Sequence, residues 1–481
     1  MKELTTQIVV IAAGPSGLSA AVQAAEDGAS VIVIEKAANI GGAANMGMGP
    51  LGIGTKYQKQ QMIDITVEKA FNMFMEYTHY QTDARLIKKY FEMSADTIEW
   101  LEDFGVEFEG AFKYFPKSEA TWHIVKTGES IGPRAASYMT KALYEKALEL
   151  GVTVLLDTTA KKIEKQDEKV SAVFATNKDG EEIKINCNAA IVCTGGAGAN
   201  PEMIKEYTGF EFGKNMFNFA IPGITGDGLK MAWEAGAAKT QVRIEMAAMI
   251  GAGEEVNMGV ANIFRQPNLL VNKFGKRIMN EEEMQNTTYL SNVVMHQKDK
   301  TCYSIVDSNI VKKYIKNGVD VVSLVHNNPD VSDFYEGIKN AQDQGMTSFF
   351  KADTLEELAE KAGIDVENFI ETVEDYNGYC DEVDSEFFKD KRYLKPIRKA
   401  PFYLGKVCGG GYGTVGGVKI NENCEAIDEE FNPVKGLYCA GADSCNIYDD
   451  SYMFLLPGNS MGYAVNTGRI AGMSASEFVN K

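Results

Sequence analysis

The chain has 481 residues, of which 45% are hydrophobic and 24% charged, and its formal net charge is -19 at pH 7. Domains usually have about 100 to 200 residues, so this length predicts two or three domains with sizeable cores. The composition is that of a globular protein, and the negative charge argues against nucleic acid or anionic lipid as a partner.

The N-terminal segment has the pattern of a β-α-β unit. Residues 7–12 form a short apolar run typical of a strand, Leu18–Asp27 is alanine-rich and helical in composition, and Ser30–Glu35 reads as a second buried strand. Apolar runs of this length on either side of a helix predict neighbouring parallel strands.

The loop between this first strand and the helix, Ala12–Gly17, reads Ala-Ala-Gly-Pro-Ser-Gly. Bare backbone there lets a pyrophosphate reach the helix N-terminus and its positive dipole end. Alanine replaces the first glycine of the fingerprint, which weakens the motif taken alone. Glu35 ends the second strand, where a carboxylate accepts hydrogen bonds from ribose hydroxyls, although an ordinary strand-end glutamate is the alternative.

The rest of the chain shows two changes of pattern. A helix at 135–150, strands at 152–156 and 189–194 and a hairpin around Asn177–Gly180 continue the first domain. Residues 245–400 mix helices, such as Thr354–Ala362 and Val366–Tyr376, with loops, and Gly462–Phe478 forms a last helix. We therefore expect a first domain at 1–243, an inserted domain at 244–400 and a return to the first domain at 401–481.

The segment Glu35–Gly42 resembles the FAD-dependent group that includes glutathione reductase and fumarate reductase. Three further glycine-bearing stretches follow in the family's order: Cys193–Asn200, Thr225–Gly228, and Gly436–Gly441 with Pro457–Gly462. The chain thus resembles the FAD-dependent oxidoreductase 2 superfamily, which contains fumarate reductase, succinate dehydrogenase and 3-ketosteroid dehydrogenase. This resemblance implies an α/β fold, with a Rossmann-type FAD-binding domain and an inserted α+β capping domain for substrate.

The resemblance also implies which residues line a non-covalently bound FAD. They are Ala13, Gly14, Ser16, Gly17, Glu35, Lys36, Gly41, Gly42, Ala43, Ala160, Thr194, Gly195, Gly196, Asp227, Gly441, Ala442, Asp443, Gly458, Asn459, Ser460 and Met461. In the family the last helix, here starting near Ser460, points its N-terminus at the flavin, and such a dipole favours hydride acceptance.

The residues with which fumarate reductases handle two carboxylates are missing. The family's glutamine-x-histidine-proline stretch appears as Glu245–Ala248 without histidine, Gly413 replaces a second carboxylate ligand, and Leu455 replaces an arginine. Thr287 is the closest match to the proton-donating arginine. Each of the two missing cationic residues would have contributed about 1.5 to 3 kcal/mol of binding free energy through charge-assisted hydrogen bonds to a carboxylate. We therefore expect a different substrate.

Apolar and aromatic residues stand near these positions: Met246, Met249, Tyr412, Tyr448, Tyr452, Met453, Phe454 and Leu455. Such a wall suits an uncharged, ring-bearing substrate, although many of these side chains would also pack a core. We predict that Met246, Gly413, Phe454 and Leu455 contact the substrate.

The predicted proton donor is one of Tyr412, Tyr448 and Tyr452, with Tyr412 first because it precedes Gly413. Related 3-ketosteroid dehydrogenases use tyrosines for proton handling, but Phe454 falls at about the position of their motif tyrosine. Glu245, His123 and Arg265 are the candidates to consider next.

These observations predict an FAD-dependent ene-reductase that acts on an activated C=C bond of an uncharged cyclic, steroid-like or phenolic substrate, or the reverse dehydrogenase, and not a fumarate reductase. An FAD-carrying electron-transfer subunit and a redox-neutral isomerase or lyase are the alternatives. The sequence has no nicotinamide domain of its own, so an external electron donor or flavin reductase is expected.

No apolar run approaches the roughly 20 residues of a membrane span, and no signal sequence is evident, which predicts a cytoplasmic protein without membrane insertion. The eight cysteines form no C-x-x-C pair, so no metal or iron–sulfur site is expected and the thiols should be buried and reduced.

Overall fold

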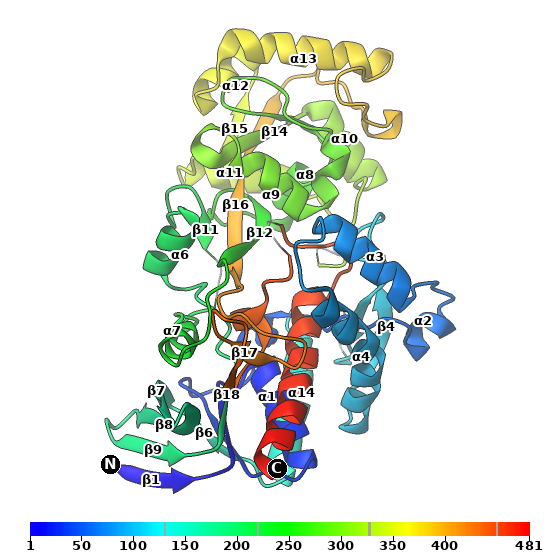
Figure 1. Ribbon diagram of the computed structural model, residues 1–481. Helices are drawn as coiled ribbons and strands as arrows, with labels where there is room; N and C mark the ends of the chain where they lie inside the picture. Colours follow the sequence, from blue (N-terminus) through cyan, green and yellow to red (C-terminus); the bar gives the residue numbers. More distant parts are fainter. Residues whose placement is uncertain (129–130, 219–220, 326–328, 449–450) are drawn as a thin grey trace. The chain divides into compact units, whose positions relative to one another are not determined.

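The computed structural model describes residues 1–128, 131–218, 221–325, 329–448 and 451–481 (Figure 1). The chain divides into two compact units. The first comprises Met1–Gly209, Ala220–Glu245 and Tyr412–Lys481, and the second comprises Phe210–Phe219 and Met246–Gly411. The short segment before residue 220 was not expected in the second unit, because its strand β11 (Phe217–Asn218) is too short to show a periodic pattern.

A six-stranded sheet in the order β17-β18-β10-β2-β3-β6 forms the centre of the first unit. All neighbours pair in parallel except β17 with β18. The strands are β2 (Ile8–Ile11), β3 (Val31–Ile34), β6 (Thr153–Leu155), β10 (Ala189–Val192), β17 (Glu425–Ile427) and β18 (Pro433–Cys439). The strands predicted at 7–12, 30–35, 152–156 and 189–194 are confirmed, and the fold is the expected α/β type.

Helices α1 (Pro15–Glu26) and α14 (Asn459–Asn480) pack closely, and α5 (Ala136–Glu149) also packs against α1. Glycines allow α1 and α14 to pack this closely, because a Cβ at Gly468 would lie 2.3 Å from the Ser16 carbonyl oxygen. The two ends of the chain therefore share one core, and the helices predicted near both ends are confirmed (Figure 1).

The first unit also contains a four-stranded sheet in the order β1-β9-β8-β7 and a hairpin of β4 and β5. These strands are β1 (Lys2–Thr5), β4 (Phe108–Phe112), β5 (Trp122–Val125), β7 (Thr158–Gln166), β8 (Lys169–Asn177) and β9 (Glu182–Asn186). The predicted hairpin near Asn177 is the turn between β8 and β9. The remaining helices are α2 (Lys56–Gln60), α3 (Val67–Tyr77), α4 (Ala84–Asp103), α6 (Pro201–Thr208) and α7 (Asp227–Glu234), with 3₁₀ turns η1 (Gly42–Met46) and η5 (Gly441–Ser444).

The second unit is built on a sheet in the order β11-β16-β14-β13, in which β12 and β15 also pair with β16. The strands are β12 (Arg243–Ile250), β13 (Leu269–Val271), β14 (Thr301–Asp307), β15 (Phe349–Ala352) and β16 (Phe402–Val415). The helices are α8 (Met258–Phe264), α9 (Thr287–Met295), α10 (Ser308–Asn317), α11 (Phe334–Asp343), α12 (Leu355–Ala362) and α13 (Val366–Asp381), with 3₁₀ turns η2 (Glu281–Gln285), η3 (Lys298–Lys300) and η4 (Lys391–Tyr393). The two helices predicted here, at 354–362 and 366–376, are confirmed.

A buried ion network ties η2 to the segment that follows α13. Arg277 pairs with Glu281 and with Asp384, each at 2.8 Å. Lys389 pairs with Glu281 at 3.1 Å and donates to the Tyr376 hydroxyl at 3.0 Å. Because an unpaired buried charge is costly, these contacts constrain both segments together.

Candidate active site

The loop between β2 and α1 has the geometry of a dinucleotide-binding turn. Ala12 adopts a φ of 90°, so alanine takes the left-handed conformation that glycine adopts more easily. A Cβ at Gly17 would lie 1.9 Å from the Ala12 carbonyl oxygen, whereas a Cβ at Gly14 would meet no atom within 4 Å. Gly17 therefore permits the close packing of the turn, and Gly14 borders open space at the helix N-terminus, where a pyrophosphate binds.

Glu35 lies beside this loop, directly after β3, and is only 8% exposed. Its two carboxylate oxygens accept the N–H groups of Ala13 and Ala37, each at 2.8 Å. Each oxygen keeps a further lone pair for a ribose hydroxyl. A cavity of about 430 Å³ adjoins the same region and is lined by Ala38, Asn39, Ile40, Asn45, Ser137, Tyr144 and Leu156.

Asp443 is fully buried and binds the loop that follows β10. It accepts the N–H groups of Thr194, Gly195 (3.1 Å) and Gly196 (2.8 Å) and the Thr194 hydroxyl (3.0 Å). Burial raises the pKa of Asp443, and these hydrogen bonds only partly offset the effect. Two predicted cofactor stretches are thus brought together, with the Asp443 carboxylate engaged by protein backbone.

Lys36 and Asp227, two further predicted cofactor residues, form an ion pair at 2.8 Å. The Lys36 ammonium also donates to the Thr225 hydroxyl at 2.9 Å. Burial opposes ionisation of Asp227, but the hydrogen bonds from Lys36 and Thr225 lower its pKa overall. This cluster links the end of β3 to the start of α7.

Three consecutive residues at the N-terminus of α14, Gly458–Ser460, make contacts that could orient a ligand. Gly458, at a φ of 82°, precedes the helix, and its carbonyl oxygen accepts the Leu51 N–H at 2.8 Å. Asn459 is buried, and its Nδ2 has no hydrogen-bond partner among the residues that the structure describes. The Ser460 N–H donates to the Tyr452 hydroxyl at 3.0 Å. A helix N-terminus with an unused donor suits a carbonyl or anionic group of a ligand.

Two of the three candidate tyrosines lie together in an aromatic cluster, which we define as Tyr114, Tyr448, Tyr452 and Phe454. Ring centroids are 4.7 Å apart for Tyr448 and Tyr452 and for Tyr452 and Phe454, and Phe454 stacks on Tyr114 at 5.0 Å. In the described part of the chain, no oxygen or nitrogen hydrogen-bonds to the Tyr448 hydroxyl. Burial raises the pKa of both tyrosines. Tyr114 was not predicted, because it follows β4 outside any motif.

Tyr412 and Gly413 have a different environment. Tyr412 lies in β16 and is 45% exposed, whereas Tyr448 and Tyr452 are buried. A Cβ at Gly413 would meet no atom within 4 Å.

Leu455 lies next to the aromatic cluster in sequence, and its carbonyl oxygen accepts the Glu119 N–H at 2.8 Å.

Met246 and Thr287 belong to the second unit. The Thr288 hydroxyl donates to the Met246 carbonyl oxygen at 3.2 Å, so β12 adjoins the start of α9. Gln285 Oε1, Asn286 Nδ2 and Thr287 Oγ1 are buried without a partner among the described residues. These uncharged polar groups lie at the start of α9, where Thr287 was predicted as the closest match to the family's proton-donating arginine.

Glu245 ranked only as a secondary candidate from the sequence, because no motif includes a carboxylate there. It lies in β12, and its charge acts on Tyr448, Tyr452 and Cys445. Burial raises the pKa of Glu245 to about 7. A carboxyl group that titrates near neutrality can serve as a general acid or base.

His123, another secondary candidate, is fully buried in β5. Its Nε2 lies 2.7 Å from the Thr55 Oγ1, and its Nδ1 lies 3.0 Å from the Thr121 carbonyl oxygen. Burial lowers the pKa of His123 to about 4. The neutral ring is therefore satisfied by its neighbours and supports the hairpin of β4 and β5.

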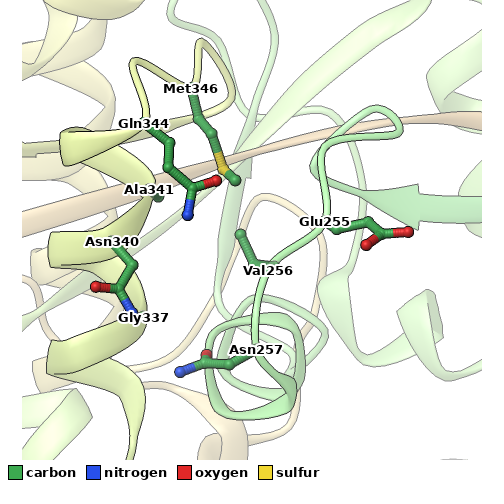
Figure 2. Close-up of a pocket in the computed structure, with 8 residues that line it drawn as sticks. All are labelled: Glu255, Val256, Asn257, Gly337, Asn340, Ala341, Gln344 and Met346. Carbon is green, nitrogen blue, oxygen red and sulfur yellow. The ribbon is translucent and has the colours of Figure 1, made fainter.

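Other features of the chain lie outside these clusters. A cavity of about 120 Å³ in the second unit is lined by Glu255, Val256, Asn257, Gly337, Asn340, Ala341, Gln344 and Met346 (Figure 2), and none of these was a predicted site residue. All eight cysteines are free, and seven are buried. None of the helices in the described ranges is long and apolar enough to cross a membrane.

Comparisons with known proteins agree with this geometry. A family model described as "FAD binding domain" matches residues 7–461. Vinyl phenol reductase of Lactiplantibacillus plantarum is 31% identical over 490 residues, which cover 98% of this chain and 97% of that protein.

Two solved structures show the shared architecture. A flavocytochrome c3 fumarate reductase in its open conformation matches with a TM-score of 0.72 at 26% identity, covering 99% of this chain and 79% of that chain. A 3-ketosteroid-Δ4-(5α)-dehydrogenase from Rhodococcus jostii RHA1 matches with a TM-score of 0.78 at 22% identity, covering 99% and 98%. The second likeness is one of fold.

Proposed function

Because this chain belongs to the FAD-binding domain family and is an FAD-dependent oxidoreductase, we propose that it reduces an activated C=C bond in an uncharged cyclic or phenolic substrate. The observation that carries the proposal is the aromatic cluster at the N-terminus of α14, where Tyr452 binds the Ser460 N–H. Similarity over nearly the full length to a vinyl phenol reductase supports the same substrate class.

The residues present fit FAD. Open space at Gly14 admits the pyrophosphate, the buried Glu35 carboxylate faces the same loop, and Asn459 Nδ2 is an unused donor at the α14 N-terminus. When bound, FAD supplies hydride transfer. The chain's own residues bind the dinucleotide and position the ring. We further propose that an external electron donor or flavin reductase supplies the electrons.

The protein must also deliver a proton to the second carbon of the double bond. Hydride addition to a conjugated alkene leaves enolate-like charge, and general acid catalysis contributes typically about 10²- to 10⁴-fold. Tyr412, Tyr448 and Tyr452 remain the candidate donors. Tyr452 now ranks first, because the Ser460 N–H and the positive end of α14 partly offset the burial that otherwise disfavours the phenolate left by donation.

The test is anaerobic photoreduction of the holoprotein, followed by mixing with 4-vinylphenol, a cyclic enone, a 3-ketosteroid and fumarate. We expect at least one of the uncharged alkenes to reoxidise the flavin absorbance and to gain two hydrogens by mass spectrometry. Reoxidation by fumarate alone, or by none of the four compounds, would contradict the proposal.

A further inference from the structure

We propose that Tyr90 is a positioning residue of the flavin site, whose hydroxyl fixes the side-chain amide of Asn459 so that the Nδ2 donor stays free for bound FAD. This inference rests on the assignment of Asn459 to the flavin site in the proposed function, and it holds whichever alkene is reduced. Tyr90 lies in α4, outside the glycine-bearing stretches of the sequence.

The Tyr90 hydroxyl binds the first residue of α14. It donates to the backbone carbonyl oxygen of Asn459 and to the side-chain Oδ1 of the same residue, each at 3.1 Å. Both side chains are fully buried. Because Oδ1 accepts this bond, the amide is held in the orientation that leaves Nδ2 without a partner in the ranges that the structure describes.

The packing around Tyr90 restricts its hydroxyl to this position. A Cβ at Gly462 would lie 2.6 Å from the hydroxyl oxygen, so glycine at this position permits the close approach. The ring of Tyr463 packs edge-on against that of Tyr90, with the centroids 5.7 Å apart. Because interiors are close-packed, the Tyr90 side chain has little room to move.

A second asparagine of α14 makes the same kind of contact with both ends of its amide engaged. Asn466 lies about two helical turns beyond Asn459, and its Oδ1 accepts the Thr97 hydroxyl of α4 at 2.7 Å. The Asn466 Nδ2 donates to the Gly462 carbonyl oxygen at 2.8 Å. The Tyr90 contact repeats this hydroxyl–amide pairing, but the Asn459 Nδ2 has no such acceptor among the described residues. An unused buried donor is costly unless a ligand supplies the acceptor.

The neighbouring groups leave Asn459 as the available donor. The Ser460 N–H is already bound to the Tyr452 hydroxyl at 3.0 Å. Burial raises the pKa of Tyr90 well above its usual range, so its hydroxyl keeps the proton that holds Oδ1.

A fixed amide donor suits the reduced state of the cofactor. Two-electron reduction adds negative charge to the flavin ring, and an N–H group binds an anionic acceptor more strongly than a neutral one. The donor therefore stabilises reduced FAD more than oxidised FAD and raises its reduction potential. Without the Tyr90 hydroxyl the amide is free to turn and to present Oδ1, which has the opposite effect.

The test measures the midpoint reduction potential of FAD in the anaerobic holoprotein against a reference dye. We expect Tyr90→Phe to lower the potential by about 30 mV, which is a ten-fold change in the equilibrium constant of a two-electron couple. The matched control is Tyr438→Phe, which removes another buried tyrosine hydroxyl bound to α14, at the Ser474 carbonyl oxygen at 3.2 Å. Its potential should equal that of the wild type.

A double-mutant cycle separates a positioning role from general support of the helix. Asn459→Ala removes the amide but keeps the backbone carbonyl oxygen that also accepts the Tyr90 hydroxyl. Asn459→Ala should itself lower the potential, and Tyr90→Phe should cause no further shift in the Asn459→Ala background. Asn459→Leu, which is closer in size and also lacks the amide, gives the same cycle if the alanine variant does not retain FAD.

The outcomes keep this inference apart from the choice of substrate. An unchanged potential in Tyr90→Phe, an equal shift in Tyr438→Phe, or a full additional shift in the Asn459→Ala background would overturn the positioning role. If the potentials behave in one of these ways while an uncharged alkene reoxidises the flavin, the proposed function stands without it. If the potentials shift as expected while no alkene reacts, the positioning role stands and the proposed function fails.

Discussion

At the scale of single residues, the N-terminus of α14 and the aromatic cluster each contain a buried polar atom without a hydrogen-bond partner among the described residues. Asn459 Nδ2 and the Tyr448 hydroxyl lack such partners within the described ranges, whereas the nitrogens of His123 are both engaged. Buried polar groups are normally hydrogen-bonded, so an unused donor is costly unless something else binds it. Chemistry is therefore better sought at the α14 N-terminus than at the histidine.

Glu35→Ala should weaken FAD binding by about 1.5 to 3 kcal/mol, the contribution of hydrogen bonds to a charged acceptor, or roughly ten- to hundred-fold in Kd. The loop would also lose the bond from the Ala13 N–H. Flavin retained after dialysis measures the effect, with the exposed Glu3→Ala as control. Equal retention by both variants would argue against a role for Glu35 in the dinucleotide site.

At the scale of elements, the packing of α1 against α14 positions the two helix N-termini of the candidate site within one unit. Small residues make this packing close, and a Cβ at Gly472 would lie 2.6 Å from the Ala20 carbonyl oxygen. Cores resist added volume because neighbouring backbone cannot move aside cheaply. The helix pair therefore acts as a rigid support for the turn at Gly14 and for Asn459.

Gly468→Ala should lower stability by about 1 to 3 kcal/mol, because its Cβ would meet the Ser16 backbone at 2.3 Å. Gly378→Ala, at an exposed position of α13 where a Cβ meets no atom within 4 Å, should instead raise stability by about 0.5 to 1 kcal/mol. Thermal unfolding of the two variants checks this difference in sign. A stabilising effect of Gly468→Ala would show that the helices are not packed as described.

At the scale of the whole molecule, we predict that denaturation releases intact FAD. A covalent link of the kind seen in respiratory relatives needs a reactive histidine, but His123 is hydrogen-bonded on both sides and His79 is exposed beyond α3. Acid precipitation followed by chromatography of the supernatant measures the released flavin. Flavin that stays with the precipitate, or that elutes as FMN, would contradict this prediction.

We also predict that neither fumarate nor succinate exchanges electrons with the bound flavin at a useful rate. Gly413, Leu455, Thr287 and Met246 stand where charge-handling residues are expected, and a dicarboxylate would lose its cationic partners. Stopped-flow absorbance with each compound checks the prediction. Turnover on the order of 10 per second, typical of ordinary enzymes, would mean that the missing residues are supplied from other positions.

The sequence by itself determined the local parts of this protein. Apolar runs placed β2, β3 and β10, and the motif spacing identified the turn at Ala12–Gly17 and the FAD family. These features depend on backbone conformation and side-chain periodicity over a few residues, which a linear pattern contains.

Only the tertiary structure decided how distant side chains meet. It placed Tyr448 and Tyr452 in one buried pair, added Tyr114 from beyond β4, and raised the pKa of the Glu245 carboxyl group by desolvation. No motif joins these positions, because burial and electrostatic coupling arise when separate elements pack together and remove water between them. The chemistry of the site is therefore a property of packing, whereas the cofactor fold is a property of the local sequence.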